Sequence, residues 1–289
     1  MEGPDFICIG PKKTATTWLA DHLKFHRDIW LPPIQELNYL NGTFSEHRDR
    51  PQLRLRWDRW SIFKRIVRNK SFSADADRAF LRMAEPLAHA DAFDLGGYRS
   101  LFTPGRQRIT GDISPMYASL EGADFDRAMP VLDQARIFLL ARDPVQRFWS
   151  ELSMHARKRT FGDVDYASIE TAHAFFNDPE RRKQHLLSDI VERWRSALGG
   201  DRLRIFFFDD IAAQPEQSLR AIVDYIGADY RKRLALVSPA RNRKAGGVRL
   251  VPDDDAREWV RQAFEEELRA CEALFGDVGA RWRRRHSGG

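Results

Sequence analysis

Long hydrophobic runs are missing from this 289-residue sequence. No stretch approaches the roughly 20 apolar residues that a membrane-spanning helix needs. The first apolar run, residues 6–9, is too short for the core of a secretion signal, and no basic segment precedes it. We therefore expect a protein without a membrane span, either cytoplasmic or a luminal domain separated from its anchor. The abundance of arginine and alanine, which is common in bacterial proteins, favours the cytoplasm.

Cysteine is equally scarce, since Cys8 and Cys271 are the only two. Two cysteines cannot form a disulfide framework or a zinc site. Cys8 lies within an apolar run and Cys271 on the apolar stripe of a late helical pattern, so we expect both to be small core residues. The sequence also lacks the Asp and His spacing of a metal site, and we expect no bound metal.

Acidic residues are outnumbered, with 42 Asp and Glu against 47 Lys and Arg and a formal net charge of +5. Arginine accounts for 38 of the 47 basic residues. Its planar guanidinium binds phosphate and sulfate through paired hydrogen bonds, so we expect an anionic ligand. Residues 47–70 also interleave basic side chains with Trp57, Trp60 and Phe63. That pattern is typical of a basic RNA- or polyanion-binding module, although a solvated amphipathic helix produces it as well.

Three short runs are continuously apolar, as strands buried on both faces of a sheet should be: residues 6–9, 137–141 and 203–208. Residues 107–110 are a weaker fourth candidate. A helical pattern follows each strong run, over residues 16–25, 145–158 and 215–226. This alternation predicts an α/β fold with a central parallel sheet flanked by helices. In such sheets ligands bind at the carboxyl ends of the strands.

The chain has no internal repeat, and we expect a single domain that spans residues 1–282. Residues 47–95 interrupt the alternation of strands and helices, and they are predicted to form a helical insertion on the sheet. The arginine-rich end of the chain, residues 283–289, is predicted to be a disordered tail, as chain termini often are.

The loop after the first predicted strand has the features of an anion site. Residues 10–19 read Gly-Pro-Lys-Lys-Thr-Ala-Thr-Thr-Trp-Leu, and a helix begins within them. The backbone N–H groups and the dipole at a helix start attract anions, and Lys13 adds a positive charge. A Walker A loop would have glycine at Ala15 and lysine at Thr16. These departures disfavour a P-loop-like nucleotide kinase, which we keep as an alternative that predicts Mg-ATP binding.

A second anion site is predicted where the run 137–141 ends. Arg142 leaves the strand, Pro144 suits the first turn of a helix, and Ser150 follows about two turns later. Arg142 and Ser150 can therefore converge on one phosphate group. Two anion sites at the ends of two strands of one sheet are much stronger evidence for an anionic ligand than either site alone.

Both sites resemble motifs of the sulfotransferases that use 3′-phosphoadenosine 5′-phosphosulfate (PAPS). Residues 13–19 resemble the 5′-phosphosulfate loop K-[ST]-G-T-T-x-L, with Ala15 in place of glycine. Residues 142–150 match the 3′-phosphate motif R-[DN]-P-x-x-R-x-x-S at every defined position. The resemblance implies a P-loop-like sulfotransferase fold, PAPS as co-substrate and adenosine 3′,5′-bisphosphate (PAP) as product. It implies nucleotide contacts from Lys13, Thr14, Ala15, Thr16, Thr17, Trp18, Arg142, Ser150 and Lys244.

Weaker matches extend the resemblance along the chain. Residues 35–40 (QELNYL) resemble the K-E-x-x-[FY]-[FL] segment of the carbohydrate-sulfating branch, and residues 111–117 (GDISPMY) resemble G-E-x-S-P-x-Y. Residues 207–211 resemble the family's apolar strand with an acidic end. The basic loop 241–247, which contains Lys244, corresponds loosely to a loop over the nucleotide.

The resemblance also implies catalytic roles. Glu36 matches the general base of the carbohydrate branch, and Lys13 is suited to stabilising the leaving phosphate. Asp112 follows another predicted strand end and is the alternative base. The implied acceptor is a hydroxyl of a carbohydrate, a glycolipid or a related small molecule, and no nucleic acid is expected. Residues 47–95 and 155–185, which face the acceptor in such enzymes, have no firm match, so the acceptor stays open.

Overall fold

The computed structural model describes residues 3–44, 74–90, 92–232 and 250–287. Its centre is a five-stranded sheet of order β2-β3-β1-β4-β5, in which every pairing is parallel. The strands are β1 (Phe6–Cys8), β2 (Ile29–Trp30), β3 (Ile109–Ile113), β4 (Arg136–Ala141) and β5 (Leu203–Phe207). The predicted α/β fold with a central parallel sheet is confirmed. Sequence patterning missed β2, because two residues are too short for a periodic signal.

Register places the strand ends at one edge of the sheet. Cys8, the last residue of β1, pairs with Ile113 of β3 and with Phe138 of β4. The loops that follow β1, β3 and β4 therefore leave the sheet on the same side. This carboxyl edge is where an open parallel sheet binds its ligand.

The sheet is buried on both faces, as its continuous apolar runs predict. Alternate side chains of β1 and β4 enter different clusters: Ile7 and Leu139 face the larger one, Phe6 and Phe138 the smaller. Cys8 and Cys271 are fully buried within these clusters, in agreement with their expected role as core residues.

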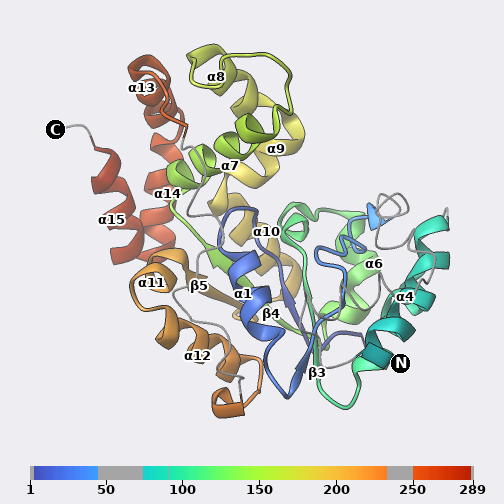
Figure 1. Cartoon of the computed structure of the whole chain (residues 1–289). Coiled ribbons are helices and arrows are strands. Elements are labelled where there is room, and N and C mark those ends of the chain that lie inside the picture. The colour runs from blue at the N-terminus through green and yellow to red at the C-terminus, as the bar shows by residue number, and fades with distance from the viewer. Residues whose placement is uncertain (1–2, 45–73, 91, 233–249, 288–289) are drawn as a thin grey trace.

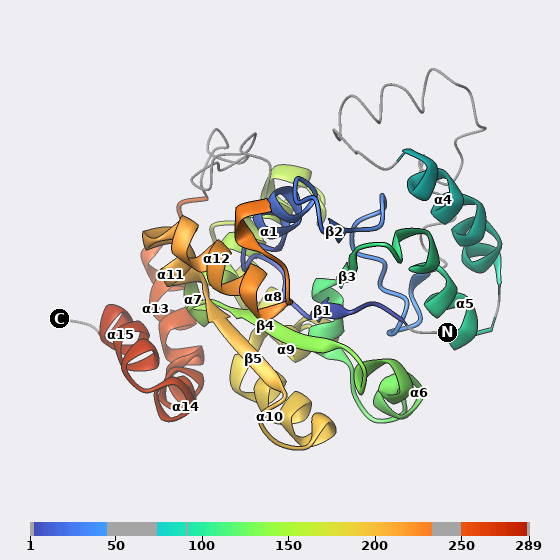
Figure 2. The ribbon, with the colours of Figure 1, turned by 90° about the horizontal axis from the view of Figure 1, so that it is seen from below.

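Helices cover the two faces in turn (Figures 1 and 2). The smaller cluster is closed by α1 (Thr16–Leu23), α11 (Phe208–Ala213) and α12 (Pro215–Tyr225). The larger one is closed by α4 (Ala74–His89), α5 (Leu95–Ser100), α6 (Ala123–Leu132), α7 (Pro144–Lys158), α8 (Ile169–Asn177), α10 (Leu187–Leu198), α13 (Asp254–Ala263), α14 (Glu265–Phe275) and α15 (Asp277–His286). The short helix α9 (Pro179–His185) packs against α8 and α10. Short 3₁₀ turns cover Thr103–Gly105, Pro115–Ser119 and Tyr230–Lys232.

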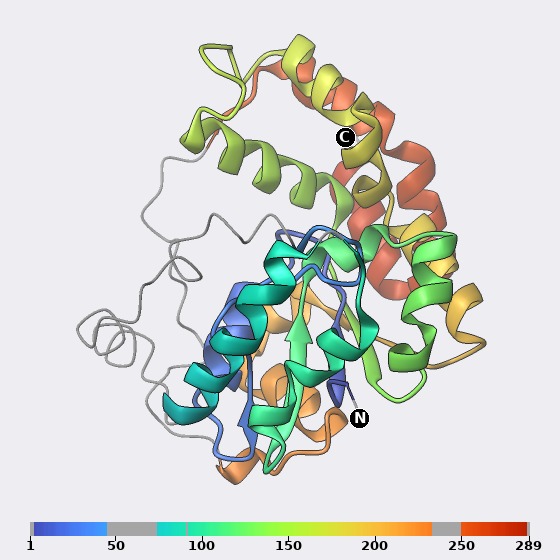
Figure 3. The ribbon, with the colours of Figure 1, turned by 90° about the vertical axis from the view of Figure 1, so that its right-hand side faces the viewer.

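The helices beyond the end of β4 bring the end of the chain back to the sheet. From β4 the chain enters α7, and α8 packs beside α13, so that this layer stands past the carboxyl edge of the strands (Figure 3). The helix α15 then returns beside α14. None of the helices in the described part of the chain is long and apolar enough to cross a membrane.

The predicted helical insertion and the predicted disordered tail differ in how they agree with the structure. Within the predicted insertion 47–95, α4 is helical and α5 begins at its end, while residues 45–73 and 91 lie outside the described residues. The expected disordered tail 283–289 is wrong for residues 283–286. These form the last turn of α15, because Arg285 and His286 bind the carboxylate of Asp143.

Candidate active site

The loop between β1 and α1 is a tight turn at the carboxyl edge of the sheet. Gly10 begins it with φ 85°, and a Cβ at this position would lie 2.4 Å from Cα of Pro115, so only glycine fits. The buried Thr14 hydroxyl donates to the Pro11 carbonyl at 2.7 Å and closes the turn. The loop is thus held by its own hydrogen bond and by close packing against the end of β3.

Ala15 is the N-cap of α1 and has the left-handed conformation, with φ 77°. Glycine adopts this conformation without strain, whereas for alanine it costs about 1 kcal/mol or more of conformational free energy. The chain therefore keeps a glycine-like loop despite the substitution. An alanine side chain cannot cap a helix, and α1 has no side-chain cap. The backbone amides of its first turn and the positive end of its dipole can therefore bind an anion beyond the carboxyl edge of the sheet.

Arg142 joins this loop to the end of β4. Its Nη1 donates to the backbone carbonyl of Lys13 at 2.9 Å. The guanidinium carbon lies 4.3 Å from the centroid of the Phe208 ring, at the end of β5. The two predicted anion sites are therefore neighbours at one edge, as a ligand with two phosphates requires. Ser150 lies half-buried two turns along α7.

A pocket opens beside the loop, on the side of β3. It encloses about 380 Å³, part of it open to solvent, and its lining includes Thr16 and Thr17 of α1, Glu36, Lys24 and Asp112. The structure thus brings the predicted base Glu36 to the start of α1. Glu36 is half-buried.

Backbone strain is concentrated around this pocket. Five non-glycine residues of the described chain have positive φ, and four of them are Lys13, Ala15, Glu36 and Asn38. Such conformations cost free energy and are typical of functional sites, where the surrounding structure imposes them. Two strained loops that face one pocket support its assignment as the reaction site.

Asp112 binds three hydroxyls, two of which hold the Glu36 loop in place. Its buried carboxylate accepts hydrogen bonds from Tyr98 at 2.9 Å, Ser114 at 2.7 Å and Tyr117 at 2.8 Å. The Ser114 and Tyr117 hydroxyls in turn accept the backbone N–H groups of Asn38 and Tyr39.

Burial raises the pKa of Asp112, and the three hydroxyl donors partly oppose that rise. A carboxylate that accepts three hydrogen bonds is better placed to organise the loop than to take a proton from an acceptor. This arrangement favours Glu36 over Asp112 as the base.

Sequence reasoning missed a buried ionic network on α7. Arg147 of the 3′-phosphate motif binds Glu151 through Nη1 at 2.8 Å and His185 Nδ1 through Nη2 at 2.8 Å. Burial and the neighbouring Arg147 charge lower the pKa of His185 to about 3. Burial acts to raise the pKa of Glu151, but the charges of Arg147, His185 and Lys12 lower it overall. The i,i+4 spacing of Arg147 and Glu151 was the available signal.

Lys244 and the basic loop 241–247 lie outside the described residues. In the described ranges no cluster of three or more His, Cys, Asp or Glu side chains is arranged to hold a metal ion.

Comparison with known proteins gives a family and a fold. The model of the sulfotransferase family matches residues 4–232. The crystal structure of a sulfotransferase from Alicyclobacillus acidocaldarius is 20% identical, with a TM-score of 0.64 over 98% of this chain and 100% of that chain. None of the curated proteins matches the sequence.

Two further solved structures are similar over less of their length. The sulfotransferase domain of the Synechococcus PCC 7002 olefin synthase is 21% identical over 88% of this chain and 83% of that chain, with a TM-score of 0.48. The sulfotransferase domain of the curacin biosynthetic pathway is 17% identical over 89% of this chain and 83% of that chain, with a TM-score of 0.49.

Proposed function

Because this chain belongs to the sulfotransferase family, which implies PAPS as co-substrate, we propose that it transfers a sulfuryl group from PAPS to a hydroxyl of a carbohydrate, a glycolipid or a related small molecule. The single observation that carries the proposal is the hydrogen bond from Arg142 to the Lys13 carbonyl, which joins the two phosphate motifs. The nucleotide kinase is disfavoured by Ala15 and Thr16, which replace the Walker A glycine and lysine. The RNA-binding alternative depends on residues 47–70, which lie outside the described residues.

The residues at the carboxyl edge fit a doubly phosphorylated adenosine. Backbone amides at the start of α1 suit the 5′-phosphosulfate, with Lys13, Thr14, Ala15, Thr16, Thr17 and Trp18 forming this site. Arg142, at the end of β4, suits the 3′-phosphate, with Ser150 as its partner. Lys244 completes the proposed nucleotide contacts. PAPS supplies the sulfuryl group and leaves as PAP.

Transfer of a sulfuryl group makes two demands on the protein. Negative charge that develops on the leaving phosphate has to be stabilised, and we assign this to Lys13 together with the amides of the loop. The acceptor hydroxyl has to lose a proton, and we assign this to Glu36, which lines the same pocket as Thr16 and Thr17. Asp112 fixes the Glu36 loop through Ser114 and Tyr117.

The experiment that tests the proposal is calorimetric titration with PAP, AMP and Mg-ATP. We expect PAP to bind much more tightly than AMP, because only PAP carries the 3′-phosphate that Arg142 recognises. Equal affinities for PAP and AMP would contradict the proposal, and tight binding of Mg-ATP would favour the kinase alternative. Transfer of ³⁵S from labelled PAPS to a panel of glycans and glycolipids then identifies the acceptor.

A further inference from the structure

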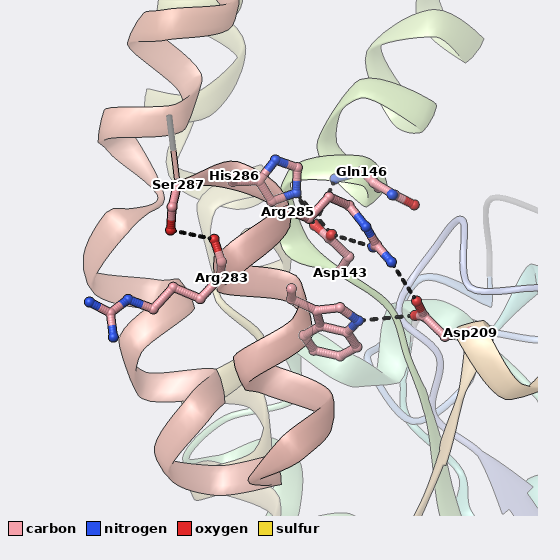
Figure 4. A network of polar contacts seen from close by, with 8 residues as sticks. Asp143, Gln146, Asp209, Arg283, Arg285, His286 and Ser287 are labelled. Carbon is pink, nitrogen blue, oxygen red and sulfur yellow. Dashed lines mark hydrogen bonds and ion pairs between the residues drawn. The ribbon is translucent and has the colours of Figure 1, made fainter. Parts of the chain in front are cut away.

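The last turn of α15 is bonded to the ends of two strands of the sheet (Figure 4). Arg285 donates through Nη1 to Asp143 at 2.8 Å and through Nη2 to Asp209 at 3.1 Å. His286 Nε2 lies 2.9 Å and 3.0 Å from the two oxygens of Asp143. Trp282 Nε1 donates to Asp209 at 3.0 Å. Arg285 is thus a bridge between the segment after β4 and the segment after β5.

Each carboxylate in this bridge directly follows, in sequence, a residue of the proposed 3′-phosphate site. Asp143 follows Arg142 in the chain, and Asp209 follows Phe208. The Arg142 guanidinium packs on the Phe208 ring, with 4.3 Å between its central carbon and the ring centroid. Fixing Asp143 relative to Asp209 therefore fixes Arg142 relative to the ring on which it packs.

Asp143 also determines where α7 begins. Its carboxylate caps the helix by accepting the backbone N–H of Gln146 at 3.1 Å, and its side chain has no exposed surface. Burial acts to raise the pKa of Asp143, but the hydrogen bonds and charges of His286 and Arg285 hold it below its usual value. The carboxylate is therefore ionised at neutral pH, one residue from an arginine that is proposed to bind a phosphate.

A buried negative charge at this position repels an incoming phosphate unless a cation compensates it. Arg285 binds both Asp143 and Asp209 and offsets one of their two negative charges, and it does so from outside the residues 4–232 that match the family. The geometry of the bridge and the balance of charge thus assign the same role to this side chain.

We propose that Arg285 is a positioning residue for nucleotide recognition, which holds Arg142 on Phe208 and offsets the charge of Asp143 so that the 3′-phosphate can bind. The inference rests on the proposed function, since it takes Arg142 as the 3′-phosphate ligand. His286, which also contacts the Asp143 carboxylate, helps to hold that carboxylate in place.

The test compares PAP and AMP affinities in four variants by calorimetry, with thermal unfolding as a check on the fold. Arg285→Ala should weaken PAP binding on the order of tenfold and leave AMP binding nearly unchanged. Arg284→Ala removes an exposed arginine from the same turn and should change neither affinity. In the Arg142→Ala background, Arg285→Ala should have no further effect, because Arg285 acts through Arg142.

A purely structural role for Arg285 gives different results. Equal losses of PAP and AMP binding, or the same additional loss in the Arg142→Ala background, would overturn the proposal. Should Arg285→Ala fail to fold, Arg285→Lys decides: lysine keeps the charge but lacks the planar guanidinium whose two nitrogens donate to the two carboxylates, so PAP affinity should fall partway while AMP affinity holds. A wild-type protein that does not prefer PAP to AMP refutes the proposed function itself, and with it this role, before any variant is measured.

Discussion

Arg142 and Lys13 are 129 positions apart in the chain, yet the Arg142 guanidinium donates to the Lys13 carbonyl at 2.9 Å. The contact joins the end of β4 to the loop after β1, which are adjacent strands of the sheet. A hydrogen bond between these residues fixes the separation of the two proposed phosphate motifs. Pre-organisation of this kind reduces the free-energy cost of ordering the site when a nucleotide binds.

Replacing Arg142 should abolish the preference for the 3′-phosphate. In Arg142→Ala we expect PAP affinity to fall on the order of 30- to 100-fold, which is the loss typical of a charged hydrogen-bond pair. AMP affinity should fall far less, because AMP has no group at this position. Isothermal calorimetry with both nucleotides checks this, with Arg284→Ala as a control of equal charge. Parallel losses for PAP and AMP would show that Arg142 only stabilises the Lys13 loop.

Ala15→Gly should stabilise the protein. The left-handed conformation at Ala15, with φ 77°, disfavours a side chain and suits glycine. We expect the free energy of unfolding to rise by about 1 kcal/mol, measured by urea denaturation. PAP affinity should be kept or improved, because the loop geometry is unchanged.

The matched control for this substitution is Ala221→Gly, at an exposed position inside α12. There the backbone is helical, so glycine should lower the free energy of unfolding by about 1 kcal/mol. Opposite signs at the two alanines would establish that strain at Ala15 is the cause. Destabilisation at both would mean that the loop relaxes to relieve the strain.

Local patterns in the sequence were enough to locate most of the sheet and the two loops that carry the proposed phosphate motifs. Strand ends, a helix start and Pro144 are encoded within a few residues, and the structure places the two predicted loops together. Contacts between distant segments were not readable in this way. Arg285 reaches Asp143 across 142 positions, and the end of a chain rich in arginine has the same composition whether it is frayed or bonded.

The details of the site depend on packing for the same reason. Three hydroxyls converge on Asp112 only because β3, α5 and the turn Pro115–Ser119 meet there. The positive φ of Ala15 follows from the tight turn between β1 and α1, and sequence alone allowed either conformation.

Glu36→Gln should separate binding from chemistry. Glutamine keeps the size of the side chain but cannot take the proton from the hydroxyl of the acceptor substrate. We therefore expect turnover to fall on the order of 10²- to 10⁴-fold. PAP affinity should stay within a factor of a few. Single-turnover transfer from labelled PAPS checks this, with Glu85→Gln on an exposed face of α4 as the control. An unchanged rate would remove the base role from Glu36.

Asp112→Asn tests the alternative base by a different readout. Asparagine replaces one acceptor oxygen with a donor that faces hydroxyls already donating to this site, so we expect the free energy of unfolding to fall by about 1–3 kcal/mol. The Glu36 loop should loosen as well, since Ser114 and Tyr117 hold it. Full stability together with lost transfer would instead identify Asp112 as the base.

His185 should make the protein sensitive to mild acid. Arg147 donates to His185 Nδ1, so the buried ring is neutral, with its proton on Nε2 toward the Phe175 carbonyl at 3.3 Å. Because the folded pKa is about 3 and the unfolded value is 6.5, the unfolded chain binds the extra proton throughout that window. Stability from His185 is therefore complete above pH 6.5 and is lost as the pH falls toward 3.

Between pH 7 and pH 5 this linkage should lower the free energy of unfolding by about 2 kcal/mol. His185→Gln can accept from Arg147 and does not titrate, so urea denaturation should show a flatter pH dependence in this variant. His89→Gln, at an exposed position on α4, should keep the wild-type dependence. The charged groups that face His185, which are Arg147, Glu151 and Arg181, remain in every variant. A wild-type pH dependence in His185→Gln would place the acid sensitivity elsewhere.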